Sequence, residues 1–123
     1  MTNPTDEQLA HALVIEGIAV YWGNGNYALA TDHLTCLHAT DFVTDPRVAD
    51  AVMGKCDQLH LHRDATFNDL KTAPWCVQVY IQLFDSKGRT MVSDEPWTYA
   101  TDPNRSRAIV RAYLKAMGVI FDG

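Results

Sequence analysis

The feature that most constrains the fold is an alternation of side chains over residues 75–84. The odd positions from Trp75 to Leu83 are apolar or aromatic, and Gln78, Tyr80 and Gln82 stand between them. Successive side chains of a strand point to opposite faces, so this pattern predicts a strand with one face on a core. Residues 85–88 have turn composition and lead into a second expected strand over residues 89–93. The sequence therefore predicts an antiparallel sheet that contains residues 75–84 and 89–93.

The first thirty residues predict a helix and a hairpin. Thr5 and Gln8 have the spacing of a capping box, and the apolar spacing that follows favours a short helix that stops at Gly17. Residues 18–22 are β-branched and aromatic, and residues 23–26 consist of glycine and asparagine, which tolerate the positive φ of tight turns. We expect a β-hairpin over residues 18–30.

Two further helices are indicated by their starts and by apolar spacing. Asp45 before Pro46 is typical of an N-cap followed by proline, which predicts a second helix over roughly residues 46–57. Asp102 and Pro103 are expected to open a C-terminal helix that ends at Gly118. The apolar stripe of that helix consists of Ile109, Ala112, Tyr113, Ala116 and Met117. Together these elements predict a single α+β domain over residues 1–123, in which an antiparallel sheet packs against amphipathic helices.

Charge and cysteine content limit the classes of partner. The chain has 123 residues and a net charge of −5, and residues 1–62 contain eight acids against two bases. We therefore expect no direct binding of nucleic acid and no membrane association through global charge. The three cysteines lack paired spacing and the N-terminus lacks the basic region of a secretory signal, which favours a reducing compartment such as the cytoplasm.

Residues 58–64 offer a candidate metal site. If they form a strand, His60, His62 and Asp64 share one side of it, where they would reach a common metal ion. The alternative is that Leu59 and Leu61 face the core while both histidines face solvent. We expect no cofactor, and a small metal-dependent hydrolase that uses these three residues stays an alternative.

Candidate partner-binding residues are acidic or aromatic. The acidic ones surround the second helix and are Asp41, Asp45, Asp50 and Asp57. They would attract a basic protein surface, although Asp45 also suits a helix cap. Trp97 and Tyr99 are candidate aromatic anchors, with a place in the sheet as the alternative.

The C-terminal helix also carries a row of basic side chains. Arg107, Arg111 and Lys115 lie four residues apart, opposite the apolar stripe. We interpret the row as a solvated helix face, with a basic contact surface as the alternative.

Three segments carry a family resemblance. Residues 42–56, the tryptophan-bearing strand region and residues 107–112 together resemble small phage and prophage proteins with an α-β-α sandwich. Those proteins are mostly of unknown function, and the resemblance implies no catalytic residues. It does imply an accessory role in a phage or prophage, and hence the cytoplasm of the bacterial host as the place of action.

No complete catalytic constellation is visible, so we expect a binding protein rather than an enzyme. The leading hypothesis is a phage accessory protein that binds or inhibits a host protein with a basic surface, for example a host defence component. A small-ligand or nucleotide-binding protein is a second alternative, and association between copies of the chain stays open.

Overall fold

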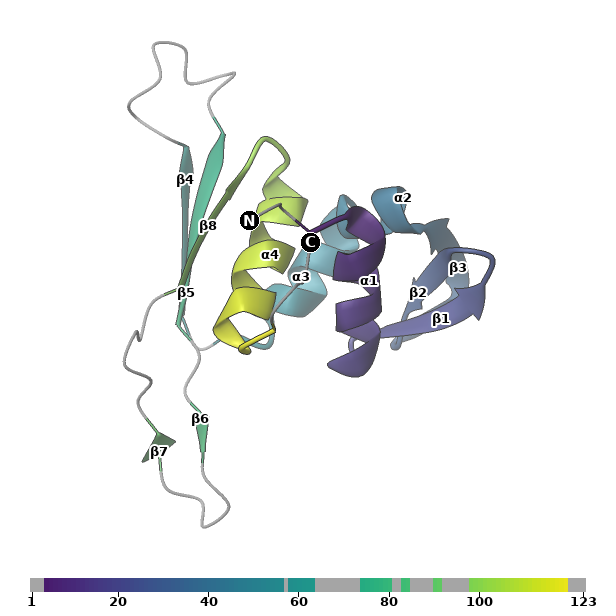
Figure 1. Ribbon diagram of the computed structural model, residues 1–123, viewed down its shortest axis with the longest axis horizontal. Helices are drawn as coiled ribbons and strands as arrows, with labels where there is room; N and C mark the ends of the chain where they lie inside the picture. Colours follow the sequence, from purple (N-terminus) through teal and green to yellow (C-terminus); the bar gives the residue numbers. More distant parts are fainter. Residues whose placement is uncertain are drawn as a thin grey trace.

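The fold is described by a computed structural model (Figure 1). It describes residues 4–56, 58–63, 74–80, 83–84, 90–91 and 98–119, and it describes no side chain at residues 33–34, 80, 83–84, 90–91 and 98–99. In chain order the elements are α1 (Asp6–Ile15), β1 (Ala19–Gly23), β2 (Asn26–Leu29), β3 (Asp32–His38), α2 (Ala39–Val43), α3 (Pro46–Met53), β4 (Gln58–Arg63), β5 (Trp75–Tyr80), β6 (Leu83–Phe84), β7 (Thr90–Met91), β8 (Thr98–Asp102) and α4 (Arg105–Ala116).

The helices lie between two antiparallel sheets (Figure 1). One sheet has the strand order β1-β2-β3 and the other has the order β4-β5-β8. Helix α4 packs against β5 and β8 on one side and against α3 and α1 on the other, while α1 contacts β1 and α2 contacts β2 and β3. An α+β domain is therefore confirmed. Its layers run sheet, helices, sheet, whereas the α-β-α sandwich implied by the resemblance has its sheet between helices.

The two helix starts expected in the first half follow from local hydrogen bonds. The Thr5 hydroxyl accepts from the Gln8 amide at 3.2 Å, and the Gln8 side chain accepts from the Thr5 amide at 2.8 Å. This reciprocal capping box starts α1 as expected. Asp45 caps α3 by accepting from the Arg47 amide at 2.8 Å, with Pro46 in the first turn. Helix α3 ends at Met53 rather than near residue 57, and β4 begins at Gln58.

The expected hairpin is β1 and β2. Gly23 pairs with Asn26 across Asn24 and Gly25, which have φ values of 55° and 77°. Positive φ at both central positions matches the right-handed twist of the flanking strands. The sequence reasoning did not identify β3 and α2, which complete this half of the molecule.

The strand expected over residues 75–84 is corrected by the structure. Strand β5 ends at Tyr80, and its neighbours are β4 and β8 rather than residues 89–93. Because both edges of β5 are already paired, a third strand has no edge to join. Strands β6 and β7 form a separate antiparallel pair, in which Leu83 is opposite Met91 and Phe84 is opposite Thr90. The expected hairpin between the end of residues 75–84 and residues 89–93 is therefore confirmed. Ile81, expected in the core, lies outside the described residues.

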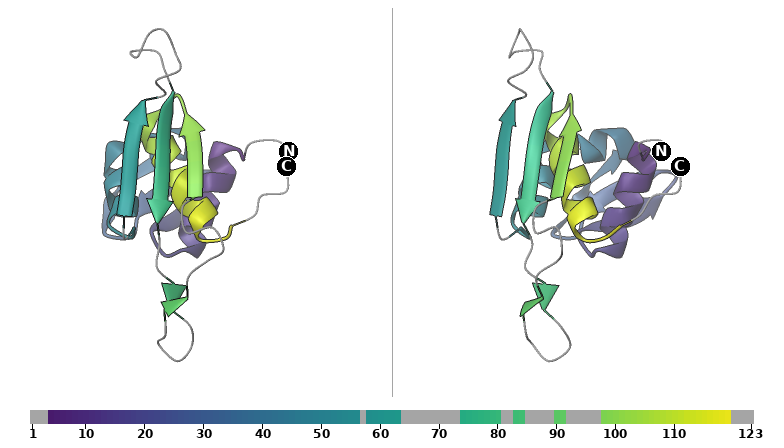
Figure 2. Two further views of the ribbon diagram at one scale, coloured as in Figure 1. Left: turned by 90° about the vertical axis from the view of Figure 1, so that its left-hand side faces the viewer. Right: turned by 60° about the vertical axis from the view of Figure 1, so that its left-hand side comes forward.

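The inward face of β5 is the expected one. Val77 and Val79 are fully buried, and Trp75 packs at the edge of the core. Figure 2 shows the three strands face-on with the helices behind them, and no described helix or strand covers the opposite face of this sheet. The core fills the space between the sheets, and its largest fully buried side chains are Phe42, Leu9, Leu13, Ile109, Leu114, Val43, Val48, Val52, Val77, Val79 and Val110.

Helix α4 is buried on more than one side. Its expected stripe is present, with Ile109, Ala112 and Tyr113 buried, but Val110 and Leu114 are buried as well. A helix between a sheet and other helices has to be apolar around most of its circumference. The helix begins at Arg105 with Asn104 as its N-cap, not at Asp102, which ends β8.

Candidate functional site

Exposed apolar surface gathers where α1 meets β1. Among the described residues, the large apolar side chains that are exposed are Ile15 at 74%, Trp22 at 55% and Tyr21 at 50%. All three fall within eight positions of the chain, at the end of α1 and in the following strand. Ile15 and Tyr21 line the same groove, whereas Trp22 does not. Exposed apolar side chains that share one surface mark an interaction site more often than scattered ones do.

A groove of about 600 Å³ lies beside Ile15 and Tyr21. It is formed by one side of α1, by the β1-β2 hairpin and by the chain after α4. Its lining residues are Thr5, Glu7, Gln8, His11, Ala12, Ile15, Tyr21, Tyr27 and Val119. The volume falls within the range of about 300–1,000 Å³ that is usual for ligand pockets.

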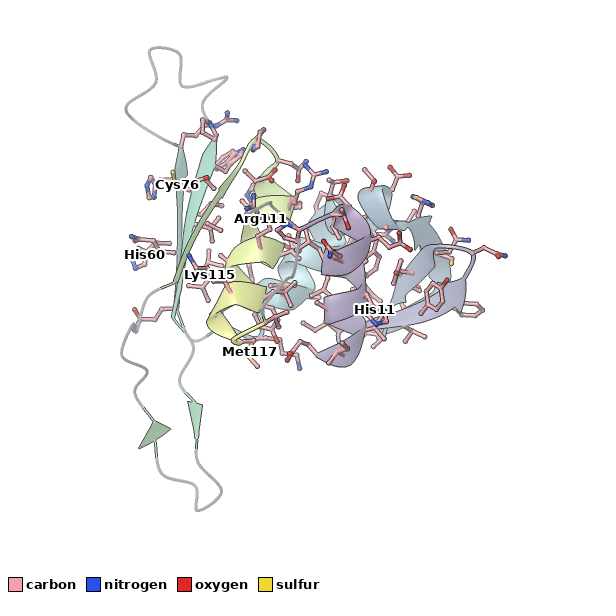
Figure 3. The ribbon with its side chains drawn as sticks, viewed as in Figure 1. His11, His60, Cys76, Arg111, Lys115 and Met117 are labelled. Atoms are coloured by element: carbon pink, nitrogen blue, oxygen red, sulfur yellow. The ribbon has the colours of Figure 1, made fainter. Side chains whose placement is uncertain are left out.

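Helix α1 supplies one wall of the groove through residues spaced by four. Leu9 and Leu13 are buried in the core, whereas Glu7, His11 and Ile15 follow one another along the outer side. Residues four apart share a helix face, so these three side chains form a single stripe. Figure 3 shows His11 on the side of α1 that faces β1.

The hairpin supplies the aromatic wall. The Tyr21 and Tyr27 rings are 5.1 Å apart between centroids, and Tyr27 continues into the core through a ring contact of 5.9 Å with Phe42. The Tyr21 hydroxyl accepts a hydrogen bond from the Gly25 amide at 3.3 Å, which ties its ring to the turn. The hairpin turn thus fixes where this aromatic surface stands.

The electrostatics of the groove are set by one carboxylate. Glu7 is exposed and is the only acidic residue among the described lining residues, none of which is a lysine or arginine. The pKa of Tyr27 is raised above its ordinary value, first by burial and then by the negative charges of Glu7 and of an ionised Tyr21. The charge of Glu7 therefore reaches Tyr27, which lies at the floor of the groove. A groove of this kind can hold an apolar group that carries or adjoins a cation.

The acidic residues expected to bind a partner have different environments. Asp41 on α2 and Asp50 on α3 are exposed. Asp45 is engaged by the fold, since its carboxylate accepts from the Arg47 side chain at 3.0 and 3.2 Å as well as from the backbone. The pKa of Asp45 is lowered, chiefly by this side-chain hydrogen bond. Asp57 lies outside the described residues.

The basic row on α4 is not a solvated face, which corrects the expectation for Arg107 and Arg111. Arg107 pairs with Asp6 at 2.7 Å and with Asp102 at 3.3 Å. Arg111 contacts Asp102 at 3.3 Å and donates to the Thr101 carbonyl at 2.9 Å. We call Asp6, Asp102, Arg107 and Arg111 the Asp102 network. The two arginines meet acids of α1 and β8 because α4 packs between these elements. The row is therefore not an open basic surface. Lys115 is exposed.

The histidines of β4 lie on the uncovered face of their sheet. His60 and His62 are exposed, whereas Leu59 and Leu61 pack against the core, as the alternative interpretation expected. Figure 3 shows His60 pointing away from α4. Within the described residues no three histidine, cysteine, aspartate or glutamate side chains are grouped so that they could hold a metal ion. Asp64, the third expected ligand, lies outside those residues.

The expected aromatic anchors are located only in part. Tyr99 lies in β8, opposite Gln78 of β5, so its backbone belongs to the sheet. Its side chain is not described, and Trp97 lies outside the described residues. The exposed aromatic side chains that the structure does describe come instead from β1.

Sequence reasoning missed the groove, although one signal pointed to it. Ile15 stands two positions after Leu13, on the side of α1 that carries Glu7 and His11. An isoleucine on the polar face of an amphipathic helix is unexpected if that face contacts only water. The sequence did not indicate that Tyr21 lines the groove. The strand pattern alone does not show which part of the strand the rest of the fold leaves uncovered.

Searches of family models, of curated proteins and of solved structures found no match to this chain. Within the described residues, no helix combines the length and the apolar character that are needed to cross a membrane.

Proposed function

We propose that this chain is a binding protein that engages a basic surface of a partner protein, and that it acts as a phage or prophage accessory factor on a host protein such as a host defence component. The phage setting rests on the resemblance of residues 42–56 and 107–112 to small phage proteins. The binding role rests on the distribution of charge in the folded chain.

One observation carries the proposal: the first half of the molecule retains exposed acids after its internal ion pairs are formed. Arg47 lies within ion-pair distance of Asp45 and Asp32, and Arg107 pairs with Asp6. Glu7, Asp41 and Asp50 are exposed and have no ion pair with another described residue. Between residues 4 and 56 the sequence has only two bases, Arg47 and Lys55. The unpaired carboxylates support association with a basic surface, because opposite potentials steer encounter and suppress wrong partners.

The test is capture of a host protein by the tagged full chain at graded salt concentrations. We expect a stoichiometric partner whose retention falls as salt screens the charges. Replacing Asp41→Asn and Asp50→Asn together should reduce retention, since both side chains are exposed and neither has a hydrogen bond or ion pair with another described residue.

A matched control carries Gln58→Lys and His62→Lys. It shifts the net charge by the same two units, but on β4, in the sheet at the other side of the molecule (Figure 1). The control should retain the partner. Equal loss in both variants would show that only net charge matters. Capture that is insensitive to salt and to both variants would overturn the acidic-surface proposal.

A further inference from the structure

From the groove between α1 and β1 we infer a docking site for a basic segment of the partner, which inserts one apolar or aromatic side chain and lays a neighbouring lysine or arginine against Glu7 and the tyrosine rings. This inference rests on the proposed function and specifies the contact that would carry it.

Ile15 and the residues at the floor of the groove supply its apolar surface. Ile15 is 74% exposed at the end of α1, and Ala12, Tyr27 and Val119 line the groove beside it. Water in contact with such a surface is released when an apolar side chain covers it, which favours association. The volume of about 600 Å³ leaves room for an anchoring side chain together with its neighbours in a chain.

The charge of the groove selects the sign of the partner. Among the described residues that line the groove, Glu7 is the only carboxylate, none is a lysine or arginine, and the remaining titratable groups are His11, Tyr21 and Tyr27. An acidic peptide or a phosphate would meet Glu7 with no cation to offset the repulsion. A purely apolar segment would remove water from Glu7 without replacing its hydrogen bonds. A lysine or arginine beside the anchor satisfies the carboxylate.

The aromatic wall favours the same cation. The Tyr21 and Tyr27 rings stand 5.1 Å apart at an interplanar angle of 46°, and Tyr21 is half exposed. The faces of aromatic rings carry partial negative charge and attract ammonium and guanidinium groups. Tyr21 is held in place by the Gly25 amide, so little ordering of this ring is needed when a cation binds.

The experiment uses three short synthetic peptides and the full chain. The first has lysines on both sides of a central phenylalanine, the second has alanine in place of the phenylalanine, and the third has glutamates in place of the lysines. We expect the first to shift the backbone amide NMR signals of Glu7, His11, Ile15 and Tyr21. Loss of the ring should weaken binding about tenfold, and the glutamate peptide should bind more weakly still.

Two variants with equal chemistry locate the contact. Ile15→Lys places a cation in the groove, at the end of a helix where a positive charge is compatible with the helix dipole. Trp22→Lys makes the same kind of change at an exposed apolar position that does not line the groove. We expect Ile15→Lys to abolish binding of the first peptide and Trp22→Lys to leave it within about twofold. Should Ile15→Lys fail to fold, Glu7→Gln provides the test, since it should weaken binding and reduce its salt dependence.

The outcomes separate this inference from the proposed function. Equal binding by the Ile15→Lys variant, or equal binding of all three peptides, overturns the groove as the docking site. If the host partner is still lost from the Asp41→Asn, Asp50→Asn variant, the proposed function stands without the groove. If the groove signals shift with protein concentration and the chain sediments as a dimer, the occupant is a second copy, and a basic partner segment is excluded. Loss of both peptide binding and partner capture rejects both proposals.

Discussion

The Asp102 network and the groove each contain a carboxylate, but the carboxylate of the network is buried and paired, whereas that of the groove is exposed. Asp102 is only 6% exposed, and its carboxylate accepts from the Asn104 amide at 2.8 Å and from Arg107 and Arg111 at 3.3 Å. Glu7 is exposed and has no ion pair within the described part of the chain. The difference shows that an acid enclosed with cations serves the fold, whereas an acid left beside an open apolar groove is available to a partner.

The cations of the Asp102 network are also engaged within the fold. The pKa of Arg107 is raised, chiefly by the hydrogen bond from its guanidinium to Asp6, so the side chain stays charged and bound within the protein. The network joins β8, α4 and α1, and it therefore connects the layers of the fold. No comparable ion pair closes the groove within the described residues.

The largest expected effect is on the network. Asp102→Ala removes the shared acceptor of two partly buried guanidinium groups and should lower the free energy of unfolding by about 3 kcal/mol. Urea denaturation measures this loss. Asp6→Ala is the control, because Arg107 keeps Asp102 as a partner, and its loss should be about 1 kcal/mol. Equal small losses in both variants would mean that the network does not hold the layers together.

A smaller effect is expected at the turn that positions the groove. Gly25 has a φ of +77°, and an added Cβ would stand 3.3 Å from His38 Nε2. Gly25→Ala should therefore cost about 1–2 kcal/mol in thermal or urea unfolding. The matched control is Gly54→Ala, where φ is −65° and the nearest atom would be 3.5 Å away. That variant should be neutral or slightly stabilising, and equal losses at both positions would argue against strain at the turn.

Asp45 and Asp50 test which acids of the first half belong to the fold. Asp45→Ala should cost about 1 kcal/mol through loss of the α3 cap, whereas Asp50→Ala should stay within about 0.5 kcal/mol. The pKa of Asp45 is lowered from its ordinary value of 3.8, so its contribution is present above pH 3.8 and is lost as pH falls through the lower value of the folded state. Unfolding measured across this range should show the difference between parent and Asp45→Ala disappearing in acid. A difference that persists at the lowest pH would contradict the ionic part of this contribution.

The smallest effect concerns the groove alone. Glu7→Gln should lower the pKa of Tyr27 toward its ordinary value of 10.0 while hardly changing stability. The pKa of Tyr113 is also raised, but by burial and by the charges of Glu16 and an ionised Cys56, so it is the internal control. NMR titration of labelled tyrosine rings measures both. An equal shift of the two residues would show that Glu7 acts through a general change in charge rather than through the groove.

The raised pKa of Tyr27 also has a consequence for alkaline stability. The neutral phenol is favoured in the folded state, so the contribution of Tyr27 is fully present below pH 10.0 and is lost as pH rises through the higher value of the folded state. Because Glu7→Gln brings the two values closer, the variant should lose less stability than the parent over that range.

Local signals in the sequence predicted several elements correctly. The Thr5 and Gln8 capping box, the Asp45 cap and the glycine-asparagine turn each depend on neighbours within four residues. The alternation in β5 likewise indicated that Val77 and Val79 face the core. Such features can be predicted because the interacting groups are joined by a few bonds.

Pairings between distant segments were not predictable from these signals. The expected hairpin of residues 75–84 with 89–93 forms between β6 and β7, but β5 pairs with β4 and β8 instead of with residues 89–93. Arg107 was interpreted as a solvated cation, whereas it reaches Asp6, which is 101 positions away in the chain. The helical spacing of Arg107 and Arg111 says which side of α4 they occupy, but not what faces that side.

The sequence by itself determined that this protein has capped helices, a tight hairpin and an apolar strand face, because each of these follows from backbone preference or from hydrogen bonds within a short segment. Tertiary structure alone decided the layer order, the burial of Asp102 among arginines and the exposure of Ile15 beside Tyr21. Burial and charge pairing depend on which distant surfaces meet. The groove exists because α1, β1 and the chain after α4 converge there, and no single segment contains the information that they do.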